Sequence, residues 1–200
     1  MKAVILGATG LVGSHVLKLL LADSSFTEVI TIGRRNPEVE HTKLTKIQKE
    51  YEEWKQSDFE GDVLFCCLGT TIKKAESQAN FRHVDYEMPL KASILFMGHI
   101  VLVSAVGADY HSKVFYNRVK GEVERDIKRV GRKLSIVRPS LLLGERNESR
   151  PSEFFAQKVM PAFNFLMPGK YRAVKAQDVA QAMIELAKGL TPTNKNIETA

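Results

Sequence analysis

The sequence has no apolar run long enough to cross a membrane. A membrane-spanning helix needs about 20 consecutive apolar residues, whereas the hydrophobic 44% of these 200 residues is spread along the chain. The short apolar stretch after Met1 ends in a Gly-Ala-Thr-Gly turn, which predicts a strand rather than a signal peptide. We therefore expect a cytoplasmic protein without a membrane partner, folded as one domain over residues 1–200.

Cysteine is scarce as well. The two cysteines, Cys66 and Cys67, are neighbours, and neighbouring strand residues point to opposite faces, so a disulfide between them is sterically poor. The five histidines are scattered singly, which leaves no ligand set with the spacing of a metal site. We predict reduced, buried, structural cysteines in a reducing compartment, and no metal site.

The sequence also lacks the mixture of basic and aromatic residues with which proteins stack on nucleic-acid bases. The net charge is +6, but basic residues are interleaved with acidic ones, as in 46–53 and 120–132. We expect a solvated surface that attracts phosphorylated ligands, and no nucleic-acid partner.

What the sequence does contain is an alternation of short apolar runs and longer helical patterns, which is typical of a parallel sheet with crossover helices. The predicted strands cover residues 3–6, 28–32, 44–48, 63–67, 100–104 and 134–137. The predicted helices cover residues 11–21, 50–56, 75–97 with a bend near Pro89, 112–130 and 176–188. The predicted fold class is therefore α/β, a doubly wound parallel sheet (Rossmann fold) with a small C-terminal substrate-side extension.

Within that extension we expect a substrate-side cap over roughly residues 145–175. Its large apolar residues are Phe154, Phe155, Phe163, Phe165 and Met167. They could line an apolar pocket, and a plain core role is the alternative for most of them.

Three glycines, Gly7, Gly10 and Gly13, lie where the first predicted strand gives way to the first predicted helix. The first lets the chain turn sharply, the second lets the backbone approach a pyrophosphate, and the third lets the helix pack closely on the strand. The helix N-terminus adds free N–H groups and a favourable dipole. This context predicts a dinucleotide site, with a structural turn in a non-binding protein as the alternative.

Arg34 and Arg35 follow the second predicted strand, where NAD-binding proteins usually carry an acidic residue for the ribose hydroxyls. Guanidinium groups bind a 2′-phosphate through charge-assisted hydrogen bonds, whereas an acidic side chain repels it. The pair predicts NADP as the cofactor, with NAD as the second choice. The alternative is that one or both arginines are solvated loop residues.

The predicted catalytic set is Ser104, Tyr116 and Lys120. Tyr116 and Lys120 are four residues apart on one predicted helix, so both side chains share a face and the ammonium can lie near the phenol. A cation beside a phenol favours the phenolate, so Tyr116 could give a proton to a substrate carbonyl oxygen as hydride arrives, or remove one in reverse. Ser104 would hydrogen-bond the same oxygen.

The Tyr-x-x-x-Lys spacing is weak by itself, because residues 51/55 and 171/175 share it. Position distinguishes Tyr116, which follows Ser104 at the carboxyl end of a predicted sheet strand. Open α/β sheets bind ligands at those strand ends. We expect the other two tyrosine–lysine pairs to be surface or packing residues.

With these residues in place, the chain resembles an atypical short-chain dehydrogenase/reductase. More narrowly, it resembles the oxidoreductases related to the HIV Tat-interacting protein, including their bacterial relatives. The resemblance extends to about Arg150 and is carried by GATGLVG (7–13), IGRR (32–35), CLGTT (67–71), VDY (84–86), VSAVGA (103–108), FYNRVKGE (115–122) and RPSLLLG (138–144), with a weaker echo at 175–179.

The resemblance implies further contacts with the cofactor. Thr9, Leu11 and Val12 would line the phosphate and the first helical turn. The loop after the fourth strand would approach both riboses with Cys67, Leu68, Gly69, Thr70 and Thr71. Pro139 and its neighbouring backbone would contact the nicotinamide carboxamide, and Tyr116 and Lys120 would touch the cofactor as well. A helix N-cap is the alternative role for Thr70 and Thr71, and Ser140 stands where many such enzymes carry glycine.

The predicted function is an NADP-dependent oxidoreductase, a monomer or homodimer, that acts on a small carbonyl or alcohol. The alternative is a regulator that senses NADP and binds a protein partner without turnover, although such a sensor does not need all three catalytic residues. A nucleotide-sugar epimerase is the weakest hypothesis, because the C-terminal part is short for a sugar-nucleotide subdomain.

Overall fold

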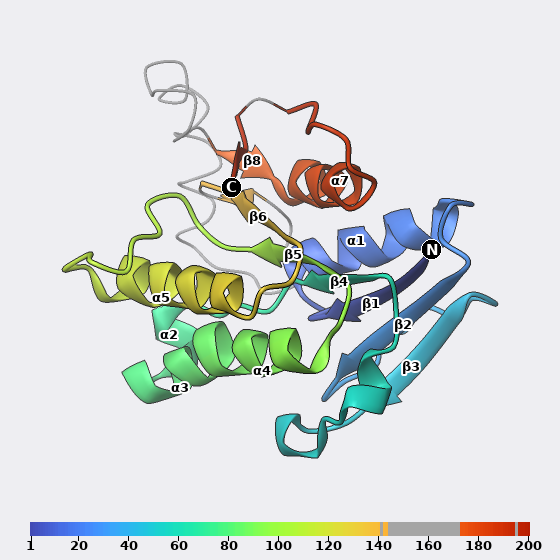
Figure 1. Cartoon of the computed structure of the whole chain (residues 1–200), viewed down its shortest axis with the longest axis horizontal. Helices are drawn as coiled ribbons and strands as arrows, with labels where there is room; N and C mark the ends of the chain where they lie inside the picture. Colours follow the sequence, from blue (N-terminus) through green and yellow to red (C-terminus); the bar gives the residue numbers. More distant parts are fainter. Residues whose placement is uncertain (141, 144–172, 195) are drawn as a thin grey trace.

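The structure, a computed structural model, describes residues 1–140, 142–143, 173–194 and 196–200. Its main feature is a seven-stranded sheet with the order β3-β2-β1-β4-β5-β6-β9 (Figure 1). The strands are β1 (Lys2–Leu6), β2 (Glu28–Gly33), β3 (Leu44–Gln48), β4 (Val63–Cys66), β5 (His99–Val103), β6 (Leu134–Arg138) and β9 (Glu198–Thr199). The first six pair in parallel, and β9 pairs antiparallel with β6. The predicted doubly wound parallel sheet is confirmed.

Helices cover both faces of this sheet (Figure 1). Two of them, α1 (Leu11–Ala22) and α7 (Ala176–Ala187), lie together on one face, and α4 (Met88–Leu95) and α5 (Phe115–Arg129) lie on the other. The short helices α2 (Ile72–Ala75) and α3 (Gln78–Arg82) precede α4. A second, two-stranded sheet pairs β7 (Leu142–Leu143) with β8 (Val174–Lys175) in parallel.

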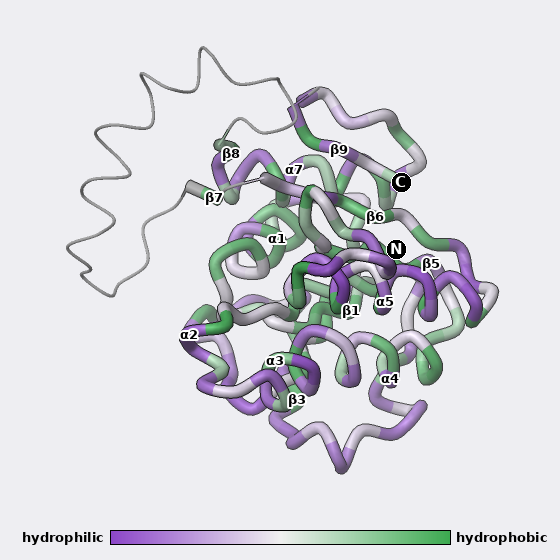
Figure 2. Tube along the Cα trace, turned by 90° about the vertical axis from the view of Figure 1, so that its left-hand side faces the viewer, coloured by the Kyte–Doolittle hydropathy of each residue, from purple (hydrophilic) through white to green (hydrophobic). Residues whose placement is uncertain are grey.

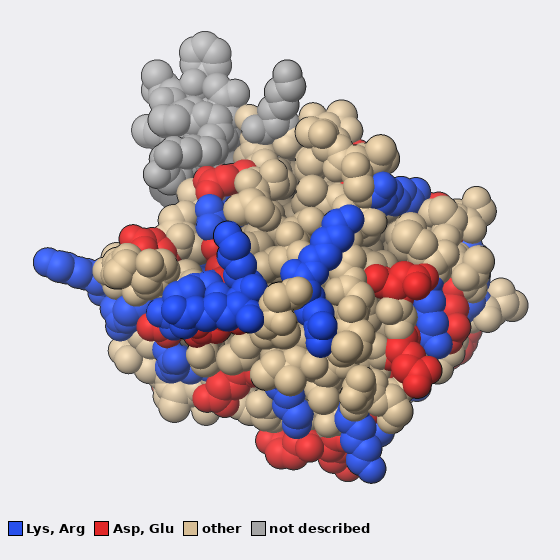
Figure 3. Space-filling view, viewed as in Figure 1, with Lys and Arg blue, Asp and Glu red and all other residues tan. Residues whose placement is uncertain are grey.

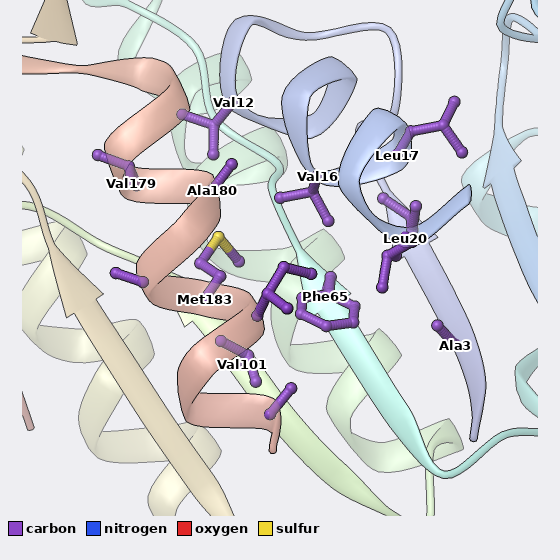
Figure 4. Close-up of a cluster of buried hydrophobic side chains, with 14 of the residues drawn as sticks. Ala3, Val12, Val16, Leu17, Leu20, Phe65, Val101, Val179, Ala180 and Met183 are labelled. Carbon is purple, nitrogen blue, oxygen red and sulfur yellow. The ribbon is translucent and has the colours of Figure 1, made fainter. Parts of the chain in front are cut away.

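The first hydrophobic core lies between the sheet and the α1–α7 pair. Val12, Val16 and Leu20 of α1 face Phe65 of β4 and Met183 of α7 (Figure 4). All five side chains are almost fully buried, and burying apolar surface of this kind is the main favourable contribution to folding. This core fixes the start of α1 against the ends of β1 and β4.

The second core lies on the other face, where α4 and α5 pack. Because successive strand residues point to opposite faces, the continuous apolar run of β4 supplies side chains to both cores. Cys66 belongs to the second core and Cys67 packs against the first. Both cysteines are free, and they point to opposite sides of the sheet, as predicted.

The segment between α2 and α4 differs from the single bent helix predicted over residues 75–97. Glu76 has a left-handed backbone with a φ of 63°, which ends α2. The element η3 (His83–Glu87) is a π-helical turn between α3 and α4. Pro89 follows the π turn in the first turn of α4, and the backbone stays helical from Gln78 to Leu95. A helix interrupted by a π turn therefore covers residues 78–95 of the predicted stretch.

Two other helix boundaries also differ. The helix predicted over residues 50–56 is a pair of 3-10 turns, Tyr51–Glu53 and Gln56–Phe59. The helix predicted from residue 112 begins at Phe115, because residues 112–114 form part of the loop after β5.

Polar residues of both charges are prominent on the outside of the molecule. Hydrophilic residues follow much of the outer trace around β3 (Figure 2), and basic and acidic side chains are interspersed on the face in Figure 3. No helix among the described residues is both long and apolar enough to cross a membrane. The cap expected over residues 145–175 lies almost wholly outside the described residues.

Candidate cofactor and active site

The predicted site residues follow the carboxyl ends of neighbouring strands. The glycine turn follows β1, Cys67 follows β4, Ser104 follows β5 and Pro139 follows β6. The central strands β1 and β4 are neighbours, and the strand order runs outward from them in both directions. Ligands of open α/β sheets bind in the crevice at such a point. The topology thus gathers residues that are far apart in the sequence at one edge of the sheet.

Close backbone packing explains two glycines of the turn. Gly7 has a φ of +79°, and a Cβ added there would lie 2.7 Å from the carbonyl oxygen of Cys67. A Cβ added at Gly13 would lie 2.1 Å from the carbonyl oxygen of Gly7. That same oxygen accepts a hydrogen bond from the Gly10 N–H at 2.9 Å. The turn is therefore pressed against the loop after β4, and α1 starts directly behind it.

The N-terminus of α1 fits a phosphate group. Its N-cap residue, Gly10, is exposed, no described side chain caps this end, and the first turn carries no acidic residue. The first N–H groups of an α-helix lack intrahelical acceptors and favour an anion. Only 6% of Val12 is exposed, because its side chain lies in the first core, so this residue can approach a phosphate only through its backbone. The cradle suits the pyrophosphate of a dinucleotide.

Arg34 and Arg35 lie exposed immediately beyond β2. Neither side chain forms an ion pair or a hydrogen bond with any described residue. Two guanidinium groups without carboxylate partners, at the same edge of the sheet as the glycine turn, can bind an anionic group of a ligand.

The loop after β4 is tied to two helices. The hydroxyl of Thr71 accepts a hydrogen bond from the Lys74 N–H at 3.2 Å and caps α2, so the N-cap alternative holds for this threonine. Thr70 differs, because its backbone N–H donates to Oδ2 of Asp85 at 2.8 Å. Asp85 of η3 thus anchors the loop that we predicted to lie near the riboses.

The surroundings of the two cysteines at this edge disfavour their thiolate forms. Burial raises the pKa of the Cys66 thiol to about 11 and raises the pKa of Cys67 well above its ordinary value. A protonated thiol is a poor nucleophile and a poor metal ligand. Among the described residues, no group of histidine, cysteine and acidic side chains could hold a metal ion.

Ser104 carries an unsatisfied hydroxyl. The residue is 4% exposed, and its Oγ has no hydrogen-bond partner among the described residues. Its backbone N–H donates to the Val137 carbonyl at 2.8 Å, and the Val106 N–H donates to the Pro139 carbonyl at 3.0 Å, which joins the ends of β5 and β6. Buried hydroxyls are nearly always hydrogen-bonded, so this hydroxyl still has a hydrogen bond to offer beyond those made by the described residues.

Tyr116 and Lys120 lie one turn apart on α5. The Tyr116 ring packs beside that of Phe81, with centroids 5.6 Å apart. Lys120 is 5% exposed, and its Nζ lies 2.7 Å from Oδ1 of Asp85, which is 1% exposed. Burial lowers the pKa of Lys120, but the Asp85 carboxylate and the Tyr116 phenol raise it, and the pKa ends above its ordinary value. Lys120 is therefore held as an ammonium next to Tyr116.

Asp85 is a member of this site that the sequence did not predict. Its one signal was a carboxylate within a helical pattern, in the VDY segment that also carries the family resemblance. The other tyrosine–lysine pairs take different positions. Tyr51 lies in a 3-10 turn with Lys91 4.4 Å from its ring centroid, and Tyr171 lies outside the described residues.

Comparisons with known proteins agree with this fold. Residues 2–84 match the family model described as the NAD binding domain of semialdehyde dehydrogenase. The solved structure of MoeE5 in complex with UDP-glucose and NAD has a TM-score of 0.69 at 15% identity, covering 98% of this chain and 73% of its own. A short chain dehydrogenase family protein from Francisella tularensis has a TM-score of 0.65 at 16% identity, covering 96% of this chain and 94% of its own. The fold is an NAD(P)-binding Rossmann fold of the short-chain dehydrogenase/reductase type.

Relatives at higher identity define the family within that class. Protein HTATIP2 of Rattus norvegicus is 37% identical over 191 residues, which are 90% of this chain and 78% of the relative. Protein FMP52-1, mitochondrial, of Scheffersomyces stipitis is 38% identical over 160 residues, which are 75% of this chain and 71% of the relative. The chain belongs to the family of HTATIP2 and FMP52, and its fold matches that of a short chain dehydrogenase family protein. The family predicted from the sequence is confirmed.

Proposed function

We propose that the chain is an NADP-dependent oxidoreductase that catalyses hydride transfer to a small carbonyl, or from the corresponding alcohol. The observation that carries the proposal is the buried Ser104 hydroxyl, which has no partner among the described residues and lies at the carboxyl end of β5. A substrate oxygen bound there would satisfy it, and the same hydrogen bond would stabilise the charge that develops on that oxygen.

The proposal assigns the acid/base role to Tyr116. Its phenol donates a proton to the substrate oxygen in reduction and accepts one in oxidation. The Lys120 ammonium, held one helical turn away, favours proton release from that phenol and offers donors to ribose hydroxyls. The nicotinamide, when bound, supplies or accepts the hydride.

The cofactor assignment follows from two features of the same edge. The turn from Gly7 to Gly13 and the first N–H groups of α1 would hold the pyrophosphate. The exposed guanidinium groups of Arg34 and Arg35 would bind the 2′-phosphate that distinguishes NADP from NAD. The resemblance adds contacts from the loop after β4 and from Pro139.

The cellular compartment and the oligomeric state of the protein are predictions from the sequence. The fungal relative FMP52-1 carries the word mitochondrial in its name, whereas the sequence led us to expect a cytoplasmic protein. Monomer and homodimer remain the two expected states.

Tyr116→Phe tests the chemistry directly. NADPH oxidation is measured against a panel of aldehydes, ketones and quinones, together with NADPH and NADH binding. We expect tight NADPH binding in both proteins and a loss of turnover in the variant on the order of 10²-fold or more, because that is the contribution typical of a general acid.

Tyr51→Phe is the matched control, since residues 51 and 55 have the same spacing outside the site. It should retain wild-type turnover. Tight NADPH binding without turnover that depends on Tyr116 would favour the sensing regulator instead, and failure to bind either nucleotide would overturn both functions.

A further inference from the structure

The π-helical turn η3 turns a carboxylate into the protein interior. Between α3 and α4 the chain widens by one residue, and the N–H of Met88 bonds the carbonyl of His83, five residues earlier. Asp85 lies in the middle of this turn and is 1% exposed. Single π turns inside helices occur frequently at functional sites, and burying a carboxylate is costly without compensating partners.

The partners of Asp85 join it to the candidate active site. One oxygen lies 2.7 Å from Nζ of Lys120 on α5, and the other accepts the backbone N–H of Thr70 at 2.8 Å. A Cβ added at Gly69 would lie 3.5 Å from Oδ1 of Asp85 and 3.9 Å from Nζ of Lys120. The ion pair therefore lies directly beneath the loop after β4, which is on the cofactor side of the sheet.

We infer that Asp85 is a positioning residue, which holds the Lys120 ammonium in its charged form and fixed beneath the loop after β4. The inference rests on the proposed function, because the placement of Lys120 affects turnover only if Tyr116 exchanges a proton. A purely structural role is a weak explanation of the pair, since desolvation offsets most of the attraction in a buried ion pair. Fixing the flexible lysine side chain is a benefit that the site itself requires.

The charge balance around Lys120 involves three elements. Asp85 faces it from η3, the Cys66 thiol from the end of β4, and the Tyr116 phenol from α5 itself. Burial keeps Cys66 neutral, with a pKa of about 11. The carboxylate of Asp85 therefore balances the ammonium at neutral pH. Without it, burial would lower the pKa of Lys120, and the ammonium would lose its proton at lower pH.

Asp85→Asn, Asp85→Glu and a control test this assignment. The first readout is the ¹³C NMR titration of the Lys120 side chain in protein labelled at lysine, without cofactor or substrate. The second is the pH profile of kcat for NADPH oxidation with the best carbonyl of the panel. In Asp85→Asn we expect Lys120 to lose its proton at lower pH than in the wild type. We also expect kcat to fall by on the order of 10- to 100-fold, as for small misplacements of catalytic groups, with the alkaline limb shifted to lower pH.

Asp58→Asn is the matched control. Asp58 is 7% exposed, lies 2.5 Å from Nζ of Lys49 and accepts the Lys55 N–H at 2.9 Å, so it has the same kinds of partner as Asp85 away from the site, with a more exposed lysine. This variant should lose stability in urea but keep the pH profile and the Lys120 titration of the wild type. Asp85→Glu keeps a negative charge, so it should restore the Lys120 titration and only part of kcat.

The outcomes separate the two proposals. An unchanged Lys120 titration in Asp85→Asn overturns the assignment of Asp85, whether or not a substrate is found. The assignment is also overturned if Asp85→Asn and Asp58→Asn lower kcat equally and neither shifts the pH profile, because loss of structure alone would then explain the fall in kcat. Absence of turnover in the wild type refutes the proposed function, while the titration still decides whether Asp85 keeps Lys120 charged. Should Asp85→Asn fail to fold, full kcat in Asp85→Glu counts against a positioning role.

Discussion

At the scale of single residues, Gly13 has the tightest steric constraint in the cofactor turn. A Cβ there would lie 2.1 Å from the Gly7 carbonyl oxygen and 3.1 Å from Cα of Ala8, and both are backbone atoms that cannot rotate away. We expect Gly13→Ala to lower the free energy of unfolding by about 2 kcal/mol or more, as overpacking does, and to weaken nucleotide binding. Urea unfolding and nucleotide titration measure both effects.

Gly33→Ala provides the comparison for that change. A Cβ at Gly33 would meet only the Arg35 carbonyl oxygen, at 3.9 Å, an ordinary contact. It should unfold close to the wild type. Equal stability of the two variants would show that the turn relaxes around an extra methyl group.

Some residues of the candidate site could be predicted from the sequence, and others could not. The positions of the glycine turn and of Ser104 at strand ends were predictable, because each depends only on the strand that precedes it. Asp85 was not, because its role depends on a contact with Lys120 from a distant helix and on a π turn that no local pattern specifies. The burial of the Val12 side chain was hidden for a similar reason, since residues near a helix N-terminus can face either the ligand or the core.

At the scale of elements, a surface ion pair joins the ends of α1 and α7. Asp23, the C-cap of α1, accepts hydrogen bonds from Lys188 beyond α7 and from the N–H and hydroxyl of Ser25. The hydrogen bond with Lys188 is the largest cause that lowers the pKa of Asp23, to about 2. The folded-state pKa lies below the unfolded value of 3.8, so the contribution is complete above about pH 5 and disappears as the pH falls towards 2.

Asp23→Asn should therefore lower the free energy of unfolding at pH 7 by about 1 kcal/mol, after allowance for solvent screening of this partly exposed pair. The difference from the wild type should shrink steadily between about pH 5 and pH 3. Urea unfolding across that range measures it. Glu60→Gln, at an exposed carboxylate outside any ion pair among the described residues, should show no such trend. A difference for Asp23→Asn that is independent of pH would contradict the assignment.

Strand positions could be predicted from the sequence where the hydrophobic pattern was strong. The apolar runs of β1, β2, β4, β5 and β6 were predicted within a residue or two, because parallel strands buried on both faces leave a continuous signal. β9 was missed, since two residues carry no periodicity. It is held instead by Arg138, which bonds Glu198 at 2.7 Å, and by reciprocal backbone bonds between Ile136 and Ala200.

At the scale of the whole molecule, cofactor choice can be tested through stability. A ligand that binds only the folded state stabilises it by about 2.7 kcal/mol at 100 times its Kd, so NADPH and NADH should each raise the melting temperature according to their affinity. The proposed role of Arg34 and Arg35 predicts a larger shift with NADPH. Replacing both by alanine should raise the Kd for NADPH by on the order of 10- to 100-fold, as expected for lost hydrogen bonds to a charged group, and leave that for NADH nearly unchanged.

Net charge is the confounding factor in that comparison, because a protein of charge +6 attracts any phosphorylated ligand. The double variant Lys18→Ala/Lys128→Ala also removes two positive charges, but from exposed positions on α1 and α5. This double variant should bind both nucleotides almost as the wild type does. Its small loss of affinity should be larger at low salt, because long-range attraction is screened within about 10 Å at 0.1 M ionic strength.

An equal loss of NADPH affinity in the two double variants would mean that overall charge governs binding. An equal loss of NADPH and NADH in the arginine variant would mean that these side chains bind a part common to both nucleotides. A selective loss of NADPH in the arginine variant alone requires direct contact with the 2′-phosphate.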